Sequence, residues 1–171
     1  MRQRLTLLVP TLNGANRLPS LLSRLRGLGA CIIVAVDNRS SDASADVARR
    51  FGAQVHTIDN PDGYIEAIIE PLSRLVKTPW VFRFDDDELP THTLIDWTVR
   101  LMTRQLKWEY KVYAFRRVWC RKNAAGLLEA ARHPPFSHNG DDLQYRLYRP
   151  ARVAYGRDLH SPAIIFGERG V

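Results

Sequence analysis

The first half of the chain alternates between short, continuous apolar runs and longer segments whose apolar residues recur every three or four positions. Continuous runs of this length predict buried strands, and the wider spacing predicts helices. The first strand should end at Pro10, and Pro71 should kink or divide the third helix. The predicted strands are 5–9, 31–36, 54–58 and 80–84. The predicted helices are 16–28, 41–51, 64–76 and 91–106.

Strands and helices that alternate over short connections predict an α/β fold, with a mostly parallel, Rossmann-like sheet flanked by helices. The second half is less regular, which predicts a smaller mixed or antiparallel C-terminal section beside that sheet. Its strand-like segments are 111–119, 143–148, 152–155 and 163–166, and a long polar loop is expected over 121–140. The 171 residues suit a single domain, with about 1–106 and about 107–171 as its two parts.

The chain has a formal charge of +7, mostly from arginine, which favours negatively charged partners such as nucleotides, phosphorylated lipids or an anionic membrane surface. The arginines are scattered and form no basic block, so nucleic acid is not an expected partner. The apolar runs are too short for a membrane-spanning helix or a signal peptide, which predicts a cytoplasmic protein. Cys31 and Cys120 are too few for a disulfide framework or a zinc site.

An acidic cluster follows the fourth predicted strand, at the edge where parallel sheets bind their ligands. It consists of Asp85, Asp86, Asp87 and Glu88. In an extended chain Asp85 and Asp87 point one way and Asp86 the other. Two carboxylates on one side favour a hard cation such as Mg²⁺ or Mn²⁺, shared with substrate phosphates. The alternative is a solvated acidic turn that caps the helix beginning near Thr91.

The ends of the first two strands also carry polar residues, and the three strand ends form an ordered pattern. The first strand leads into Pro10-Thr11-Leu12-Asn13, and the second ends in a segment that runs from Asp37 to Asp42. With these segments and the Asp85-Asp86-Asp87 cluster, the chain resembles the family 2 glycosyltransferases over about residues 4–105. A looser match covers 142–149 and His160, where some members carry Arg-Leu-Phe-Arg and then Val-His-Glu. The resemblance implies the A-type glycosyltransferase fold.

The resemblance also implies a role for each strand end. Residues after the first two strands would hold the base and ribose of a nucleoside-diphosphate sugar, of UDP or GDP type. The donor-binding residues would be Pro10, Thr11, Asn13, Asp37, Asn38, Ser40, Asp85 and Asp86. Asp87 and Asp85, with His160, would hold Mn²⁺ or Mg²⁺ against the donor diphosphate. Alternatively, Asp37 caps the following helix, Asn13 belongs to an ordinary turn, and His160 has a structural role.

An inverting transfer also needs a base that deprotonates the acceptor hydroxyl. In the family this is usually a carboxylate of the second half, which makes Asp142 and Asp141 the first candidates and Glu129 the third. Arg146 and Arg149 follow on the next strand, where they could meet phosphate. The alternative is a solvated loop for these carboxylates and a solvated strand face for the arginines.

The expected function is therefore a metal-dependent glycosyltransferase that acts, with inversion, on a glycan or lipid-linked acceptor. Its excess positive charge would suit peripheral association with the inner membrane face, in lipid-linked or surface polysaccharide synthesis. One alternative is a catalytically silent module that only binds the nucleotide sugar. Another is a different nucleotide-using α/β enzyme, such as a nucleotidyltransferase, although the Asn13-Gly14-Ala15-Asn16-Arg17 segment is a poor phosphate loop.

Overall fold

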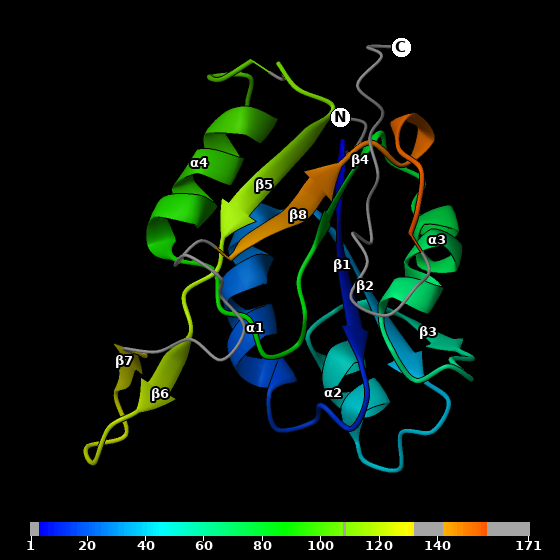
Figure 1. The fold of residues 1–171 in the computed structure, drawn as a ribbon, viewed down its shortest axis with the longest axis vertical. Helices are drawn as coiled ribbons and strands as arrows, with labels where there is room; N and C mark the ends of the chain where they lie inside the picture. The colour runs from blue at the N-terminus through cyan, green and yellow to red at the C-terminus, as the bar shows by residue number, and fades with distance from the viewer. Residues whose placement is uncertain (1–3, 108, 132–141, 157–171) are drawn as a thin grey trace.

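The structure, a computed structural model, describes residues 4–107, 109–131 and 142–156. A six-stranded sheet in the order β3-β2-β1-β4-β8-β5 forms its centre (Figure 1). Four strands are parallel: β1 (Leu5–Thr11), β2 (Cys31–Asp37), β3 (Gln54–Ile58) and β4 (Trp80–Arg83). Two strands are antiparallel to their neighbours: β8 (Leu143–Tyr148) pairs with β4, and β5 (Val112–Arg116) pairs with β8. The α/β fold with a mostly parallel sheet is confirmed.

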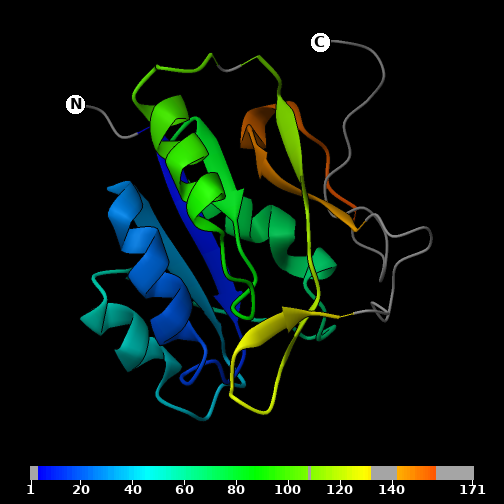
Figure 2. The same ribbon diagram turned by 90° about the vertical axis from the view of Figure 1, so that its left-hand side faces the viewer.

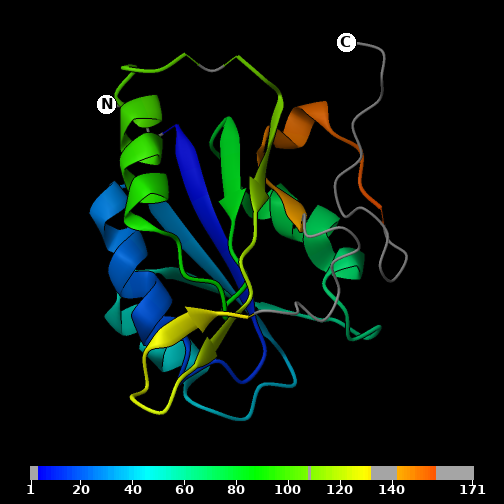
Figure 3. The same ribbon diagram turned by 60° about the vertical axis from the view of Figure 1, so that its left-hand side comes forward.

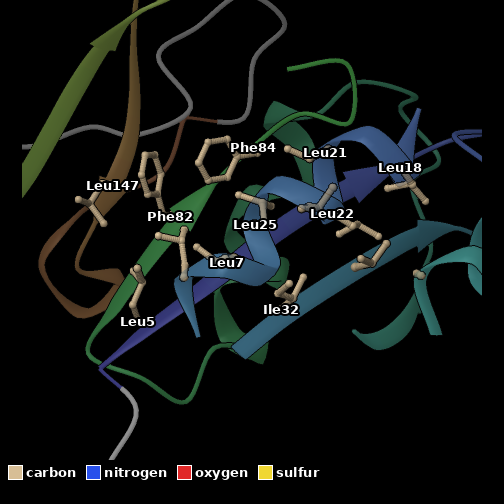
Figure 4. Packing of buried hydrophobic residues seen from close by; sticks show 14 of the residues in the cluster. Leu5, Leu7, Leu18, Leu21, Leu22, Leu25, Ile32, Phe82, Phe84 and Leu147 are labelled. Atoms are coloured by element: carbon tan, nitrogen blue, oxygen red, sulfur yellow. The ribbon is translucent and has the colours of Figure 1, made fainter. Parts of the chain in front are cut away.

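Helices cover both faces of this sheet (Figures 2 and 3). One face carries α1 (Leu18–Leu25), α2 (Ser44–Arg50) and α4 (His92–Met102), and the other carries α3 (Glu66–Leu75). Each face has its own apolar core, because side chains alternate along the buried strands. Figure 4 shows the larger core, in which Leu18, Leu21, Leu22 and Leu25 pack against Leu5, Leu7, Phe82 and Leu147. No helix in the described ranges has the length and apolar content needed to cross a membrane.

The structure refines several predicted boundaries. The first strand continues through Pro10 to Thr11, and its pairing with β4 ends earlier, at Leu8 opposite Arg83. Pro10 therefore lies beyond the β4 ladder, where a missing N–H is tolerated. The third helix is not divided, since α3 continues through Pro71. The predicted helix 16–28 consists of α1 and a short 3-10 turn, η1 (Arg26–Leu28), which ends at the left-handed Gly29.

The second half departs most from the predicted pattern. The expected loop over 121–140 contains part of a hairpin, β6 (Cys120–Lys122) with β7 (Leu128–Ala130), which projects from the body on the left of Figure 1, below β5 and beyond α1. The predicted strand 152–155 is wrong, because a 3-10 turn, η2 (Pro150–Arg152), precedes a single bridge residue there. The predicted strand 163–166 lies outside the described residues.

Candidate active site at the carboxyl edge of the sheet

The loops after β1 and β2 are joined by hydrogen bonds that pass from one loop to the other. The Asn13 side-chain oxygen accepts from the Ser41 N–H at 2.9 Å, and the Asn13 N–H donates to Ser40 Oγ at 3.2 Å. The next two backbone N–H groups continue this link. Gly14 donates to Ser44 Oγ at 2.8 Å, and Ala15 donates to Asp42 at 2.9 Å. These hydrogen bonds therefore fix the loop after β1 against the loop after β2.

Asn13 and Gly14 allow the β1–α1 loop to approach its neighbours closely. Asn13 has a φ of 49°, in the left-handed region that asparagine tolerates better than most residues. A Cβ added to Gly14 would collide with Thr11 Oγ1 and with the Asp86 carboxylate. The Thr11 hydroxyl itself donates a hydrogen bond to Asp86. This loop therefore packs directly against the acidic segment after β4.

Asp37, at the end of β2, is buried and held by Arg39. Its carboxylate accepts from Arg39 Nε at 2.8 Å, from Nη2 at 2.7 Å and from the Arg39 N–H at 2.9 Å. The Arg39 side-chain hydrogen bond is the main reason that the pKa of Asp37 lies below its usual value. The Arg39 side chain remains about half exposed, whereas the Asp37 side chain is buried. The neighbouring Asn38 amide donates to Asp59 at 2.9 Å.

Asp86 points toward β1 and is bound by Arg17. Arg17 Nε donates to Asp86 Oδ1 at 2.9 Å, and Nη2 donates to Oδ2 at 2.8 Å, which makes a two-point ion pair. The Asp86 hydrogen bond is the main reason that the pKa of Arg17 lies above its usual value. Both oxygens of Asp86 are therefore used inside the protein.

Asp85 points the other way, toward two buried arginines on neighbouring strands. Arg83 Nη1 donates to Asp85 Oδ1 at 2.9 Å, and Arg146 Nη2 donates to Oδ2 at 2.6 Å. The same Nη2 of Arg146 also reaches Glu88 at 2.5 Å. The first two aspartates thus diverge as expected, although they follow β4 in a turn and not within the strand.

Burial is the main cause of the pKa shifts of Asp85 and Glu88. Removal from water raises the pKa of Asp85, against the lowering influence of Arg83. Burial, followed by repulsion from Asp85, raises the pKa of Glu88 to about 8. Two carboxylates that share one guanidinium nitrogen therefore both resist ionisation.

Asp87 differs from its neighbours because it is exposed, and no hydrogen bond or ion pair to it is found within the described residues. The described ranges also contain no group of three His, Cys, Asp or Glu side chains arranged around a metal position. Mg²⁺ and Mn²⁺ sites that bind a substrate phosphate often use only one or two carboxylates. Asp87 fits such a ligand as it stands. Asp85 fits only through Oδ2, the oxygen that Arg146 now holds.

Asp142 lies at the start of β8 and is bound from three directions. It accepts from Arg117 Nε at 2.7 Å, from Trp119 Nε1 at 2.9 Å and from Gln144 at 2.5 Å. Burial raises the pKa of Asp142, but these hydrogen bonds outweigh it and hold the pKa below its usual value. A carboxylate with this pKa and these partners is a weak proton acceptor. Arg117 also approaches Glu88 at 3.8 Å, which connects Asp142 to the acidic segment.

The structure thus brings together most of the residues predicted for the site. The ends of β1, β2 and β4 meet at one edge, as the sheet topology requires. Asp141 and His160 lie outside the described residues, so their predicted roles as base and metal ligand stay predictions.

Sequence reasoning gave no site role to the arginines that neutralise these carboxylates, Arg17, Arg39, Arg83 and Arg117, and gave Arg146 only a phosphate role. Two of them carry a local signal, because Arg39 and Arg83 each lie two residues from the aspartate that they bind. Arg83 and Asp85 follow the rule that residues two apart in an extended chain point the same way, whereas Arg39 lies in the turn that directly follows Asp37. Arg17 and Arg146 carry no such signal, since 69 and 61 residues separate them from Asp86 and Asp85.

A family model described as "Glycosyl transferase family 2" matches residues 6–123. The structure of S. aureus TarS 1–349 has a TM-score of 0.60 at 15% identity, covering 93% of this chain and 52% of that one. Its complex with UDP has a TM-score of 0.58 at 15% identity, covering 87% and 47%. The 4-diphosphocytidyl-2C-methyl-D-erythritol synthase from Anaerococcus prevotii has a TM-score of 0.53 at 9% identity, covering 87% and 72%.

At these identities the likenesses to solved structures show the fold alone. The chain spans about half the length of the TarS fragment. No curated protein gives a significant match to the sequence.

Proposed function

Since this chain belongs to glycosyl transferase family 2, we propose that it transfers a sugar from a nucleoside-diphosphate donor to an acceptor hydroxyl. The observation that carries this proposal is the meeting of three polar strand ends at one edge of a parallel sheet, the place where such sheets bind ligands. Hydrogen bonds from Asn13, Gly14 and Ala15 to the β2–α2 loop hold this edge in shape before any ligand arrives. A preorganised edge of this kind lowers the cost of binding.

The donor base and ribose would lie against the β1 and β2 strand ends. Asp37 would act there through Arg39, because the oxygens of Asp37 are occupied and the Arg39 side chain is the more exposed member of the pair. A planar guanidinium can stack on a base or donate to its carbonyl oxygens. TarS has been crystallised with UDP and with UDP-GlcNAc, which supports a uridine donor as the first choice.

The donor diphosphate would lie near Asp87, which would hold Mg²⁺ or Mn²⁺ through its exposed carboxylate. The metal, when bound, neutralises charge on the departing nucleoside diphosphate. Asp86 would keep the β1 loop in place through Arg17 and would not touch the metal, since both of its oxygens are already bound.

The acceptor side of the site would include Asp142 and the residues bound to it. The hydrogen bonds to Asp142 suit a residue that positions Arg117 and Trp119, while Asp141 lies outside the described residues. The role of Asp141 or Asp142 as the base, the inversion, the glycan or lipid-linked acceptor and the membrane association all stay predictions.

Thermal unfolding with nucleoside diphosphates tests the donor site. Saturation near 100 times Kd should add about 2.7 kcal/mol to the free energy of unfolding, a rise in Tm of about 5–11 °C for a chain of this size. We expect a shift with UDP that increases with Mn²⁺ and loses its Mn²⁺ dependence in Asp87→Ala. Asp46→Ala is the matched control, because Asp46 is an exposed aspartate on α2 that forms an ion pair with Arg49. No shift with any nucleotide in the folded protein would reject the donor site.

Product analysis separates the proposal from its alternatives. A transferase releases the nucleoside diphosphate from the sugar donor, and a silent binding module shifts Tm without any release. A nucleotidyltransferase would instead join a nucleoside triphosphate to a sugar phosphate, and pyrophosphate would leave from the triphosphate. The likeness to the 4-diphosphocytidyl synthase concerns the fold and does not favour this last reaction.

A further inference from the structure

Arg146 lies where a cation would lie between Asp85 and Glu88. Its Nη2 contacts both carboxylates, at 2.6 Å and 2.5 Å, and it comes from β8, far from either residue in sequence. Arg146 is itself only 4% exposed. A buried positive charge between two acids is the arrangement that a bound metal also provides.

The contacts of Arg146 are incomplete. Its Nε and Nη1 are buried and have no hydrogen-bond partner, so only one of its three nitrogens is used. Unpaired buried donors are costly, and native proteins seldom keep them. This arrangement therefore suits a state in which Arg146 has yet to meet another partner.

The two oxygens of Asp85 are held by different arginines. Arg83 binds Oδ1 and Arg146 binds Oδ2. Arg146 can leave Oδ2 while Arg83 keeps the carboxylate in orientation. Glu88 remains as a hydrogen-bond partner for Arg146, so its guanidinium is not left isolated.

We propose that Arg146 is an internal cation that competes with the divalent metal for Asp85 Oδ2 and thereby sets the metal affinity of the site. The metal binds Asp87 first and takes Asp85 only when Arg146 releases it. The free donors of Arg146 then face the anionic diphosphate that arrives with the metal. The proposal rests on the proposed function, because it requires a metal at Asp87.

Direct binding of Mn²⁺ without donor, followed through the electron paramagnetic resonance signal of free Mn²⁺, tests this competition. A hydrogen bond between charged groups is worth enough that its removal should strengthen Mn²⁺ binding in Arg146→Met by about tenfold. The gain should vanish when Asp85→Asn is added, since the freed oxygen is then lost. Arg117→Met is the matched control, because it removes a nearby positive charge without touching Asp85.

A double-mutant cycle on positions 146 and 85 separates competition from a general effect of charge. If Arg146→Met strengthens Mn²⁺ binding when residue 85 is Asp and not when it is Asn, the result supports the proposal. An equal gain in both backgrounds, an equal gain in Arg117→Met, or no gain at all overturns it while leaving the donor site intact. If wild type does not bind Mn²⁺ even with UDP, this proposal and the metal site both fall, whereas a Tm shift with UDP alone would still support the donor site.

Arginine side-chain ¹⁵N spectra of the wild-type protein test the proposal even if Arg146→Met does not fold. The Arg146 signal is assigned as the one that disappears in Arg146→Lys. We expect this signal to move when Mg²⁺ and UDP are added together. If the Arg146 signal does not move although nucleotide is bound, the proposal that Arg146 releases Asp85 to the metal is overturned.

Discussion

Gly14 leaves no room for a side chain, so even a single added methyl group should destabilise the folded protein. An added methyl group would collide with Thr11 and Asp86, which lie on two different loops of the site. We predict that Gly14→Ala lowers the free energy of unfolding by about 1–3 kcal/mol and weakens the Tm shift with UDP. Chemical denaturation measures the first effect and thermal unfolding the second.

Gly27→Ala is the control for this prediction. Apart from the adjoining backbone and chain neighbours, no atom of the described residues lies within 4 Å of a Cβ built at Gly27, so the substitution should be neutral or stabilise by up to about 1 kcal/mol. If both variants behave alike, the close packing at Gly14 is not what stabilises the loop.

Glu88 should make the stability of the protein depend on pH. Its pKa is raised to about 8 in the folded protein, against about 4.3 in an unfolded chain. The folded state therefore keeps a proton that the unfolded state loses, so the free energy of unfolding should fall as the pH rises from about 5 to 8. Urea denaturation at both pH values should show a smaller fall for Glu88→Gln than for wild type. Equal falls in the two proteins would contradict the assignment, and Asp46→Asn should behave like wild type.

At the scale of elements, α3 tolerates a proline that should weaken it. Pro71 lies inside the helix and is exposed, so it removes a helical hydrogen bond without adding buried surface. We predict that Pro71→Ala raises the free energy of unfolding by about 1–2 kcal/mol, after allowance for a more flexible unfolded chain. Equilibrium denaturation measures the change.

Pro19→Ala provides the contrast on α1. Pro19 occupies the first turn of that helix, where its missing N–H would have no helical partner. The substitution should therefore give no gain and should lose up to about 1 kcal/mol. A gain at both prolines would show that position within the helix is not the reason.

Element positions were well predicted wherever the pattern was local. The apolar spacing of α1 and the continuous runs of β1, β2 and β4 appear at the expected residues. The hairpin β6–β7 was missed, because it is short, exposed and lacks the alternation that a half-buried strand shows. The strand expected near 152–155 failed because Pro150 begins a 3-10 turn there.

At the scale of the whole molecule, β8 connects the two predicted parts. It lies between β4 and β5, so the sheet is complete only when residues from the second half return to the first. Leu147 packs into one core and Tyr148 into the other, where its hydroxyl lies 3.0 Å from Ser73 Oγ. The two parts therefore share both apolar cores.

We predict that a fragment of residues 1–106 does not fold cooperatively. Without β8, the apolar residues of β4 would lie at an open edge and lose their antiparallel partner. Thermal circular dichroism should show a broad transition or none, while the full chain unfolds in one step. A sharp transition for the fragment would show that the first part is a domain of its own.

The sequence by itself determined the order of strands and helices in the first half, the parallel arrangement and the edge at which Pro10–Asn13, Asp37 and the aspartate triplet gather. These features follow from local periodicity and from the rule that parallel strands end at one edge. The tertiary structure alone decided which positive charge meets each acid. Arg17 and Arg146 reach Asp86 and Asp85 only because α1 and β8 fold against the end of β4. Ion pairs between distant residues leave no periodic trace, so three adjacent aspartates that look equivalent in the sequence have three different environments in the folded protein.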